Sequence, residues 1–396
     1  MMAGSGVGQL RCSFSFRAKV GGAAGVGDSS WVRRRREHSL SLGSNPPCPS
    51  GTAPFEKGGA RLACCLVLLL GAGCSSTPPA ASPALPPRVT VFEGSCDASG
   101  AVAIDHRSFV VADDEDNVLR IYDAESGGRP IRAIDVSPTL FQDADPAEAD
   151  LEAATRLGDL ALWLTSHGRN QRGGEEPNRL LFFATTIPRD DQDLHVIGRP
   201  YRGLLGDLIQ DPQLQRFDLE AASQKPPKSE GGLNIEGMTA TAGGHVLIGM
   251  RNPVPDGLTL LVVLENPAGV FERDEPPKVR DVYRLDLGGR GVRALSWWRG
   301  RYLIAAGNPG DGGQSRLFTW RGGRAKPEAV EIDLAFLNPE GFFTPENRDE
   351  MMVLSDDGET VVGGTPCKYL QDPSRKTFRG AWLGFDVLGE PPDDDD

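Results

Sequence analysis

A pattern that recurs five times along the chain constrains its fold more than any other feature. Each copy has a polar residue and a small residue, then an apolar run, a short turn and a second apolar run that ends in polar residues. The five copies begin at Ser99-Gly100, Glu152-Ala153, Glu236-Gly237, Arg293-Ala294 and Glu340-Gly341. Further short apolar runs follow each copy, bounded by the Gly, Pro, Asn and Asp residues typical of turns. Such repetition indicates a repeat architecture.

Short strands at regular spacing predict an all-β fold, and units of about four strands favour a β-propeller over a sandwich. We expect five four-stranded blades, with six as the alternative. The last unit lacks a fourth strand, whereas Arg88–Glu93 (RVTVFE) is a strand-like run outside the units. This N-terminal strand is therefore predicted to complete the last blade and close the ring, which removes exposed sheet edges. Between Tyr201 and Ser223 the apolar spacing is closer to helical, which predicts one helical insertion near residues 201–223.

The N-terminal part of the chain has the composition of a targeting segment. Residues 1–56 are rich in Gly, Ser and Arg and show little periodicity, so we expect no fold there. A start codon assigned too far upstream and a disordered basic arm are the two interpretations. Residues 57–73 combine Lys57 and Arg61 with a short apolar run, which is typical of a secretory signal peptide.

The segment Leu70-Gly71-Ala72-Gly73-Cys74 resembles a bacterial lipobox. The resemblance implies that Cys74 is lipidated and anchors the protein to a bacterial membrane, on its extracytoplasmic side; an uncleaved signal anchor is the alternative. Residues 74–87 form a Pro- and Ala-rich tether, residues 88–390 the propeller domain and residues 391–396 an acidic tail. The predicted domain contains two cysteines, Cys96 and Cys367. In an exported protein they can form a disulfide, with two buried free thiols as the alternative.

The charge of the chain is divided unevenly. The whole chain has a formal net charge of −13, and residues 1–73 contain nine Lys and Arg but three Asp and Glu, which leaves −19 for the rest. A domain this acidic repels phosphate backbones, so the sequence argues against nucleic acid as a partner. The same charge is compatible with cationic ligands or a bound metal.

The repeats also predict where polar side chains gather. In an up-and-down blade the first strand lines the central channel, and the second strand runs back to the same face. The polar residue that starts the first strand should therefore meet the residues that end the second strand at one rim. The candidate ligand-binding residues on this rim are Glu152, His167, Arg169, Asn170, Glu236, Arg251, Asn252, Arg293, Asn308, Glu340 and Asp356. Ser99, Asp113, Asp114 and Asp357 are expected on the same rim.

Glu152, Glu236 and Glu340 are the candidate metal ligands, because clustered carboxylates suit a hard cation such as Ca²⁺. Arg251 and Arg293 are an alternative counter-charge that would leave a metal-free polar site, and purely structural strand-start acids are a third interpretation. His167 is either a general base or ligand-binding group on the rim or a hydrogen-bonded structural histidine. The acidic run at residues 113–117 lacks the glycine and distal glutamate of a calcium loop, which favours a hairpin turn.

Several motifs resemble a bacterial family known only as domain of unknown function 3616. They include Asp150-Leu-Glu152-Ala, Thr165-Ser-His167-Gly-Arg169-Asn170, Asn178-Arg179-Leu-Leu-Phe-Phe-Ala-Thr and Gly-Leu-Asn-Ile-Glu236-Gly-Met. The resemblance spans Val89 to about Leu383 and implies an extracytoplasmic, propeller-like lipoprotein without a known activity. The Glu-Gly placement is also similar to calcium-dependent lactonase-type propellers and esterase-like phytases, by position only.

Two functions follow as hypotheses. The first is a non-enzymatic cell-envelope protein that binds a small ligand or an envelope protein at the channel rim, because no complete catalytic constellation is visible in the sequence. The second is a calcium-dependent hydrolase of the lactonase or phosphoesterase type, which would use the rim glutamates.

Overall fold

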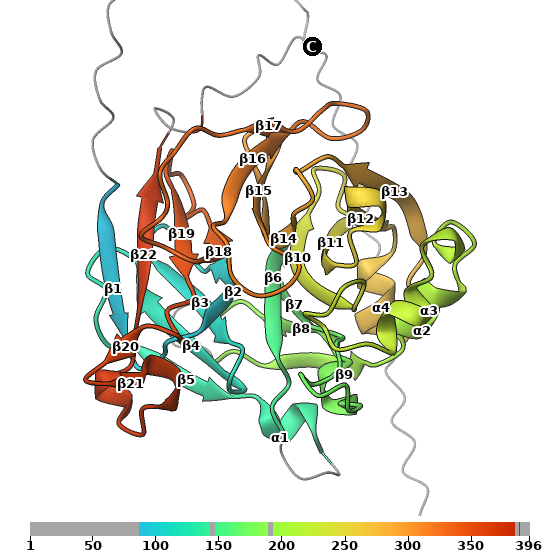
Figure 1. Cartoon of the computed structure of the whole chain (residues 1–396). Coiled ribbons are helices and arrows are strands. Elements are labelled where there is room, and N and C mark those ends of the chain that lie inside the picture. The colour runs from blue at the N-terminus through green and yellow to red at the C-terminus, as the bar shows by residue number, and fades with distance from the viewer. Residues whose placement is uncertain (1–86, 143–146, 189–192, 385–387, 389–396) are drawn as a thin grey trace, which may run out of the picture. The chain divides into compact units, whose positions relative to one another are not determined.

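The structure, a computed structural model, describes residues 87–142, 147–188, 193–384 and 388. These residues form five four-stranded antiparallel sheets arranged as the blades of a β-propeller (Figure 1). The predicted fold class is thus confirmed, with five blades rather than six. The expectations for residues 1–73, for Cys74 and for the acidic tail fall outside the described residues, as does the tether apart from Pro87.

Each of the first four blades is one continuous stretch of chain, with its innermost strand first. Blade 1 consists of β2 (Ala98–Ala103), β3 (Ser108–Asp113), β4 (Val118–Asp123) and β5 (Arg132–Asp135). Blade 2 consists of β6 (Leu151–Leu157), β7 (Leu160–Thr165), β8 (Phe182–Thr186) and β9 (Val196–Tyr201). Blade 3 consists of β10 (Asn234–Ala240), β11 (Val246–Asn252), β12 (Thr259–Leu264) and β13 (Val279–Leu285). Blade 4 consists of β14 (Gly291–Trp298), β15 (Arg301–Gly307), β16 (Arg316–Trp320) and β17 (Glu328–Ala329).

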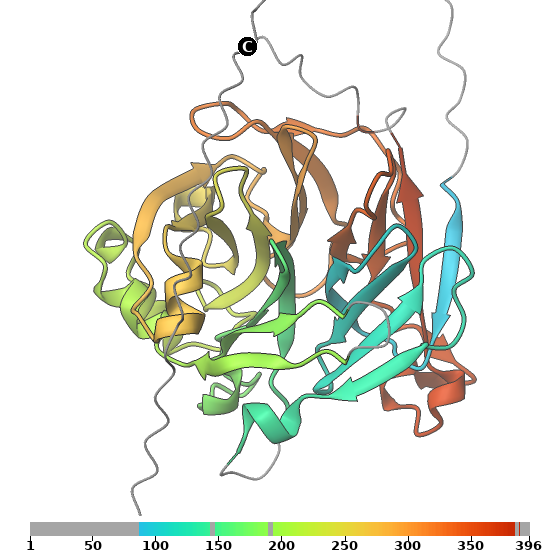
Figure 2. The ribbon, with the colours of Figure 1, turned by 180° about the vertical axis from the view of Figure 1, so that it is seen from behind.

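Blade 5 joins the two ends of the domain. Its strands, from the inside outward, are β18 (Pro339–Phe343), β19 (Met351–Ser355), β22 (Thr377–Leu383) and β1 (Val89–Glu93). The antiparallel pairing of β1 with β22 confirms that the N-terminal strand closes the ring. Figure 2 shows the same ring from behind, with β1 in blue beside β22 in red. Two short strands, β20 (Val361–Val362) and β21 (Thr365–Pro366), form a separate hairpin within the β19–β22 connection.

A disulfide lies beside this closure. Cys96, shortly after β1, is bonded to Cys367 in the β19–β22 connection, at an S–S distance of 2.08 Å. Both side chains are buried, together with Leu370. The covalent bond and the β1–β22 pairing therefore hold together the same two ends of the propeller domain.

The predicted helical insertion is present between blades 2 and 3. It contains α2 (Leu204–Gln210) and α3 (Leu219–Ser223), separated by a 3₁₀ turn at Gln215–Phe217. Its buried apolar side chains pack against side chains of β7, β8, β10 and β11, which explains the helical spacing of its leucines. The insertion begins after β9, which ends at Tyr201.

Two elements differ from the sequence-based expectation. The apolar run at residues 329–336 (AVEIDLAF) is one of the short runs that follow the repeated units and are typical of strands, but β17 is limited to Glu328–Ala329. The backbone N–H of Val330 still donates to the carbonyl of Leu317 in β16 at 2.9 Å. Leu334 is buried, and Val330 and Ile332 pack partly buried against the same cluster, so burial explains why the run is apolar beyond β17. The helices α4 (Pro267–Arg273) and α1 (Ser137–Leu140) were not predicted from the sequence. No helix among the described residues is long and apolar enough to cross a membrane.

Candidate functional site

The innermost strands share one irregularity that directs polar side chains. In β6, β10, β14 and β18 the pairing register shifts across Glu152, Glu236, Arg293 and Glu340, respectively. In β2 the shift falls between Ala98 and Ala101. A β-bulge inserts an extra residue and re-aims its side chain. The bulge thus explains why one polar residue recurs at the start of every innermost strand.

The position after each polar residue must be small for a different reason. A Cβ atom built on Gly341 would lie 2.2 Å from the carbonyl oxygen of Ser99 in the neighbouring blade. A Cβ atom on Gly100 would lie 2.5 Å from the backbone of Ala153. Neighbouring innermost strands therefore approach so closely at this level that glycine or alanine is required.

A cavity of about 800 Å³ lies where the innermost strands begin. Its lining includes eleven acidic residues: Asp97, Asp114, Glu115, Glu148, Asp150, Glu152, Glu236, Asp311, Glu340, Asp356 and Glu359. Its six basic residues are Arg172, Arg179, Lys228, Arg251, Arg293 and Lys368. A smaller cavity of about 330 Å³ lies at the opposite ends of the same strands. The larger cavity is therefore the mouth of the channel at which the sequence predicts polar residues.

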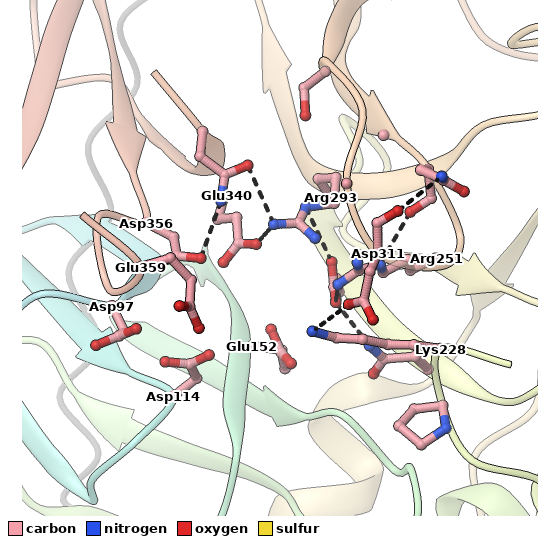
Figure 3. A pocket seen from close by; sticks show the side chains of 18 of the residues that line it. Asp97, Asp114, Glu152, Lys228, Arg251, Arg293, Asp311, Glu340, Asp356 and Glu359 are labelled. Atoms are coloured by element: carbon pink, nitrogen blue, oxygen red, sulfur yellow. Dashed lines mark hydrogen bonds and ion pairs between the residues drawn. The ribbon is translucent and has the colours of Figure 1, made fainter. Parts of the chain in front are cut away.

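On one side of this cavity, acidic and basic side chains form ion pairs with one another. Arg251 Nη1 donates to Glu236 Oε1 at 2.5 Å, and Asn234 donates to the same oxygen at 2.7 Å. Arg293 Nε lies 3.5 Å from Glu236 Oε2, and Arg293 Nη2 pairs with Glu340. Figure 3 shows Arg293 between Glu340 and the Arg251 side of the pocket. All four charged side chains of this network are buried, so each charge is compensated by a direct partner.

The other side of the cavity is a carboxylate cluster. Asp114, Asp150 and Glu152 each offer an oxygen within 4.8 Å of the others, and so do Asp97, Asp113 and Asp114. Asp114 comes from the β3–β4 turn of blade 1, while Asp150 and Glu152 come from the start of β6 in blade 2. Figure 3 shows Asp97 and Asp114 on the side of the pocket away from Arg251, with Glu152 between them and Lys228.

Burial and mutual repulsion oppose ionisation in this cluster. Burial, followed by the charges of Glu236 and Asp150, raises the pKa of Glu152 well above its ordinary value. Burial and the nearby Glu152 and Asp356 do the same to the pKa of Asp114. Burial and Asp356 raise the pKa of Asp97 to about 9. Burial and repulsion therefore disfavour the charged forms of these carboxyl groups unless a positive charge compensates them.

The structure does not bring together the three glutamates expected to bind a metal. Among the described residues, the groups of three carboxylates with close oxygens do not include the set Glu152, Glu236 and Glu340. Glu236 and Glu340 pair with Arg251 and Arg293, which is the alternative counter-charge expected from the sequence. Glu152 meets Asp114 and Asp150 instead.

The remaining expected rim residues divide into two groups. Asn170, Asn308 and Asp356 line the cavity, whereas Arg169 and Asn252 do not. Arg169 donates to the carbonyl of Ser223 at 2.8 Å and to Gln224 at 2.6 Å, so it holds the end of the helical insertion. Asn252 donates to the carbonyls of Pro227 and Ser229 and so fixes the loop before β10.

His167 is also absent from the lining of the cavity. Its side chain is buried, its Nδ1 lies 2.8 Å from the carbonyl oxygen of Thr165, and its backbone adopts a φ of 56°. Burial lowers the pKa of His167 to about 4, so the imidazole is neutral at physiological pH. These contacts favour the structural interpretation of this residue over the general base.

The sequence reading did not select Asp97, Asp114 or Asp150 as candidate ligands. Asp114 was expected on the rim but interpreted as part of a hairpin turn, and the β3–β4 connection is indeed a turn. Asp150 stands two residues before Glu152, just before β6, and an acid this close to a rim glutamate was an available signal. Asp97 follows Cys96 and had no sequence signal that we can identify.

Comparison with known protein families gives one match. Residues 196–343 match the family described as "Protein of unknown function (DUF3616)". The resemblance to this family is confirmed, over a shorter segment than the expected range from Val89 to about Leu383. No curated protein matches the chain.

Several solved structures are similar at low identity. The PQQ-bound aldose sugar dehydrogenase of Streptomyces coelicolor has 10% identity and a TM-score of 0.39, with 76% of this chain and 100% of that chain covered. Glutaminyl cyclase of Myxococcus xanthus has 10% identity and a TM-score of 0.37, with 75% and 94% covered. A luciferin-regenerating enzyme has 9% identity and a TM-score of 0.36, with 77% and 98% covered. Similarity at this level says nothing about a shared activity.

Proposed function

We propose that this chain is a cell-envelope lipoprotein whose β-propeller binds a small, polar, positively charged ligand at the channel mouth. The observation that carries the proposal is the excess of carboxylates in the cavity, eleven against six Lys and Arg residues. A cavity of about 800 Å³ is also within the size range of small-molecule sites. A field of this sign attracts cations and repels anions.

The arrangement of charges favours binding over catalysis. A general acid or base must reach the reacting group, and His167 does not line the cavity. The rim glutamates Glu236 and Glu340 are held in ion pairs with buried arginines. This network stabilises the ring and leaves the carboxylate cluster to contact a ligand.

The proposed location rests on the N-terminal sequence. A signal segment at residues 57–73 and a lipobox ending at Cys74 support lipid anchoring on the extracytoplasmic side. The disulfide between Cys96 and Cys367 fits an exported protein, because disulfides persist in oxidising compartments. If Cys74 is the anchor, Cys74→Ser will abolish incorporation of labelled fatty acid and release the protein from the membrane fraction.

The ligand proposal is tested by calorimetry on the purified protein in the presence of a chelator. The panel contains small amines and amino sugars, each with a neutral or anionic compound of matched size. We expect micromolar to millimolar binding of cationic members only. The variant Asp311→Asn/Glu359→Gln removes two exposed charges from the cavity and should weaken binding roughly threefold to fivefold.

The control is Glu331→Gln, which removes an exposed acid that does not line the cavity. It should leave binding unchanged. Binding of anionic and cationic members alike, or no binding by any member, would contradict the proposal.

A calcium-dependent hydrolase of lactones or phosphoesters is the second candidate function. The observation in its favour is the close group of Asp114, Asp150 and Glu152, which opens on the same cavity. Turnover of a lactone or phosphoester panel that requires added Ca²⁺ would support it, and absence of turnover at saturating Ca²⁺ would exclude it.

A further inference from the structure

We infer that Asp114, Asp150 and Glu152 form a binding site for one hard divalent cation of the calcium type. The inference deepens the proposed function, on which it rests for the role of the cavity. The residue set differs from the three glutamates expected from the sequence, since it contains Glu152 but neither Glu236 nor Glu340. It joins blade 1 to blade 2 at the channel mouth.

The distances within the group fit a single ion. One carboxylate oxygen from each residue lies within 4.8 Å of the other two. Ca²⁺ binds oxygen ligands at about 2.3–2.6 Å, so two oxygens on opposite sides of the ion are separated by about 5 Å. Three oxygens that approach this closely can therefore surround one ion after small movements of the side chains.

The second observation is that a buried carboxylate in this group has no partner. Glu152 is 8% exposed, and among the described residues its carboxylate has no direct hydrogen-bond or ion-pair partner, while Arg251 and Arg293 act on it only at longer range. The Oδ1 atom of Asp114 is buried and also lacks a hydrogen-bond partner. Burying an uncompensated charge is strongly unfavourable, and a bound cation removes this cost.

Asp150 is already held in place for such a role. Arg179 Nη1 donates to Asp150 Oδ2 at 2.9 Å, and Arg179 Nη2 donates to Glu148 at 2.5 Å. A carboxylate oxygen has two lone pairs, so Asp150 can accept this hydrogen bond and still bind an ion. Outer partners of this kind orient the ligands of metal sites.

The neighbouring group of Asp97, Asp113 and Asp114 is less suited to an ion. Asp113 accepts hydrogen bonds from the hydroxyl of Ser95 and, at 2.9 Å, from the backbone N–H of Glu115. Its carboxylate is therefore occupied by Ser95 and by the β3–β4 turn. Asp97 and Asp356 lie nearby and add negative potential without belonging to the group of three.

The donor atoms indicate the class of ion. The group contains only carboxylate oxygens, with no histidine or cysteine, which favours hard cations over zinc. The cavity leaves room for water molecules to complete six to eight ligands, as Ca²⁺ requires. Mg²⁺ demands nearly ideal octahedral geometry and loses its water reluctantly, so we expect it to bind more weakly.

The experiment is calcium titration of the full chain after treatment with a chelator, by calorimetry and by elemental analysis. We expect one Ca²⁺ per chain, with a dissociation constant at or below about 1 mM. Glu152→Gln should weaken binding by roughly tenfold or more, because it removes one of three charged ligands. The matched control is Glu331→Gln, an exposed acid outside the cavity and outside the group, which should bind within about threefold of the parent.

Melting in the absence of calcium separates lost binding from lost folding. Glu152→Gln should melt at or above the parent temperature, because a neutral amide replaces an uncompensated buried charge. Asp114→Asn, in the β3–β4 turn, provides a second variant with the same expected loss of binding. Absence of calcium binding at millimolar concentration, or equal binding by parent and Glu152→Gln, would overturn the inference.

The two proposals can fail separately. If organic cations bind in the presence of a chelator while calcium does not bind, the proposed function stands and the metal site is wrong. If calcium binds through Glu152 while no organic cation binds, the metal site stands and the ligand proposal is wrong.

Discussion

Glu152 and Glu236 occupy equivalent places at the starts of β6 and β10, yet they meet different neighbours. Glu236 is compensated by Arg251 from the end of β11, at 2.5 Å. In blade 2, Ser166 takes the place of Arg251, because Leu151 pairs with Thr165 as Ile235 pairs with Met250. The nearby Arg169 turns toward Ser223 and Gln224 at the end of the helical insertion. Glu152 therefore lacks the counter-charge that its position in the repeat predicts. Whether a rim glutamate is paired or free to bind a cation therefore depends on the side chains around it, and its own identity does not decide this.

A testable prediction at the scale of single residues concerns His167. Its pKa is about 4 in the folded protein and about 6.5 in the unfolded chain, so the unfolded state binds more protons between these values. Stability from this residue is therefore present above pH 6.5 and is lost as the pH falls toward 4, by up to about 3 kcal/mol. Asn tolerates the positive φ of this position. In urea unfolding at several pH values, His167→Asn should lose less stability than the parent between pH 7 and pH 4.

The carboxyl groups with raised pKa values favour the folded state as the pH falls, which opposes the effect of His167. They are present in both the parent and His167→Asn, so their effect cancels when the two proteins are compared. An identical loss of stability in parent and variant would show that His167 does not titrate as the structure implies.

At the scale of elements, the innermost strands combine a bulge with a close approach between blades. The bulge turns the polar side chain toward the channel, and the small residue beside it lets the adjacent strand pass. The outer strands lack this requirement, which is why the polar-small pair marks the first strand of each unit. One repeated pair of residues therefore serves both the rim and the packing of the ring.

This arrangement predicts that Gly341→Ala destabilises the protein by about 1–3 kcal/mol, as expected for overpacking. The added Cβ would lie 2.2 Å from the carbonyl oxygen of Ser99, which belongs to rigid backbone. The control is Gly206→Ala in α2, where an added Cβ meets nothing within 4 Å. That variant should be neutral or slightly stabilising, because alanine favours helix. Chemical unfolding measures both, and equal midpoints for the two variants would contradict the packing argument.

At the scale of the whole molecule, stability depends on how the ring is closed. β1 supplies the outermost strand of blade 5, and the disulfide joins Cys96 to Cys367 across 271 residues of sequence. Either connection restrains the first and last blades from separating. A propeller closed in this way exposes few strand edges to other chains.

The double variant Cys96→Ser/Cys367→Ser should lower the free energy of unfolding by about 2–5 kcal/mol, because the disulfide closes a long loop of the unfolded chain. Thermal or urea unfolding with and without a reducing agent measures this loss. The parent should approach the variant when reduced, and the variant itself should not respond to the reducing agent. A parent that melts at the same point as the variant would show that β1 alone closes the ring.

The sequence by itself determined the all-β class, the repeated units, the closure by residues 88–93 and the set of polar residues that start the innermost strands. These features depend on local periodicity and on turn chemistry, which a single chain displays directly. Only the tertiary structure decided which charges meet. Arg293 reaches glutamates of two neighbouring blades, and Asp114 of blade 1 meets Asp150 and Glu152 of blade 2. Contacts between blades depend on the curvature of the ring and on the direction of each side chain, and neither is encoded in the spacing of residues within one blade.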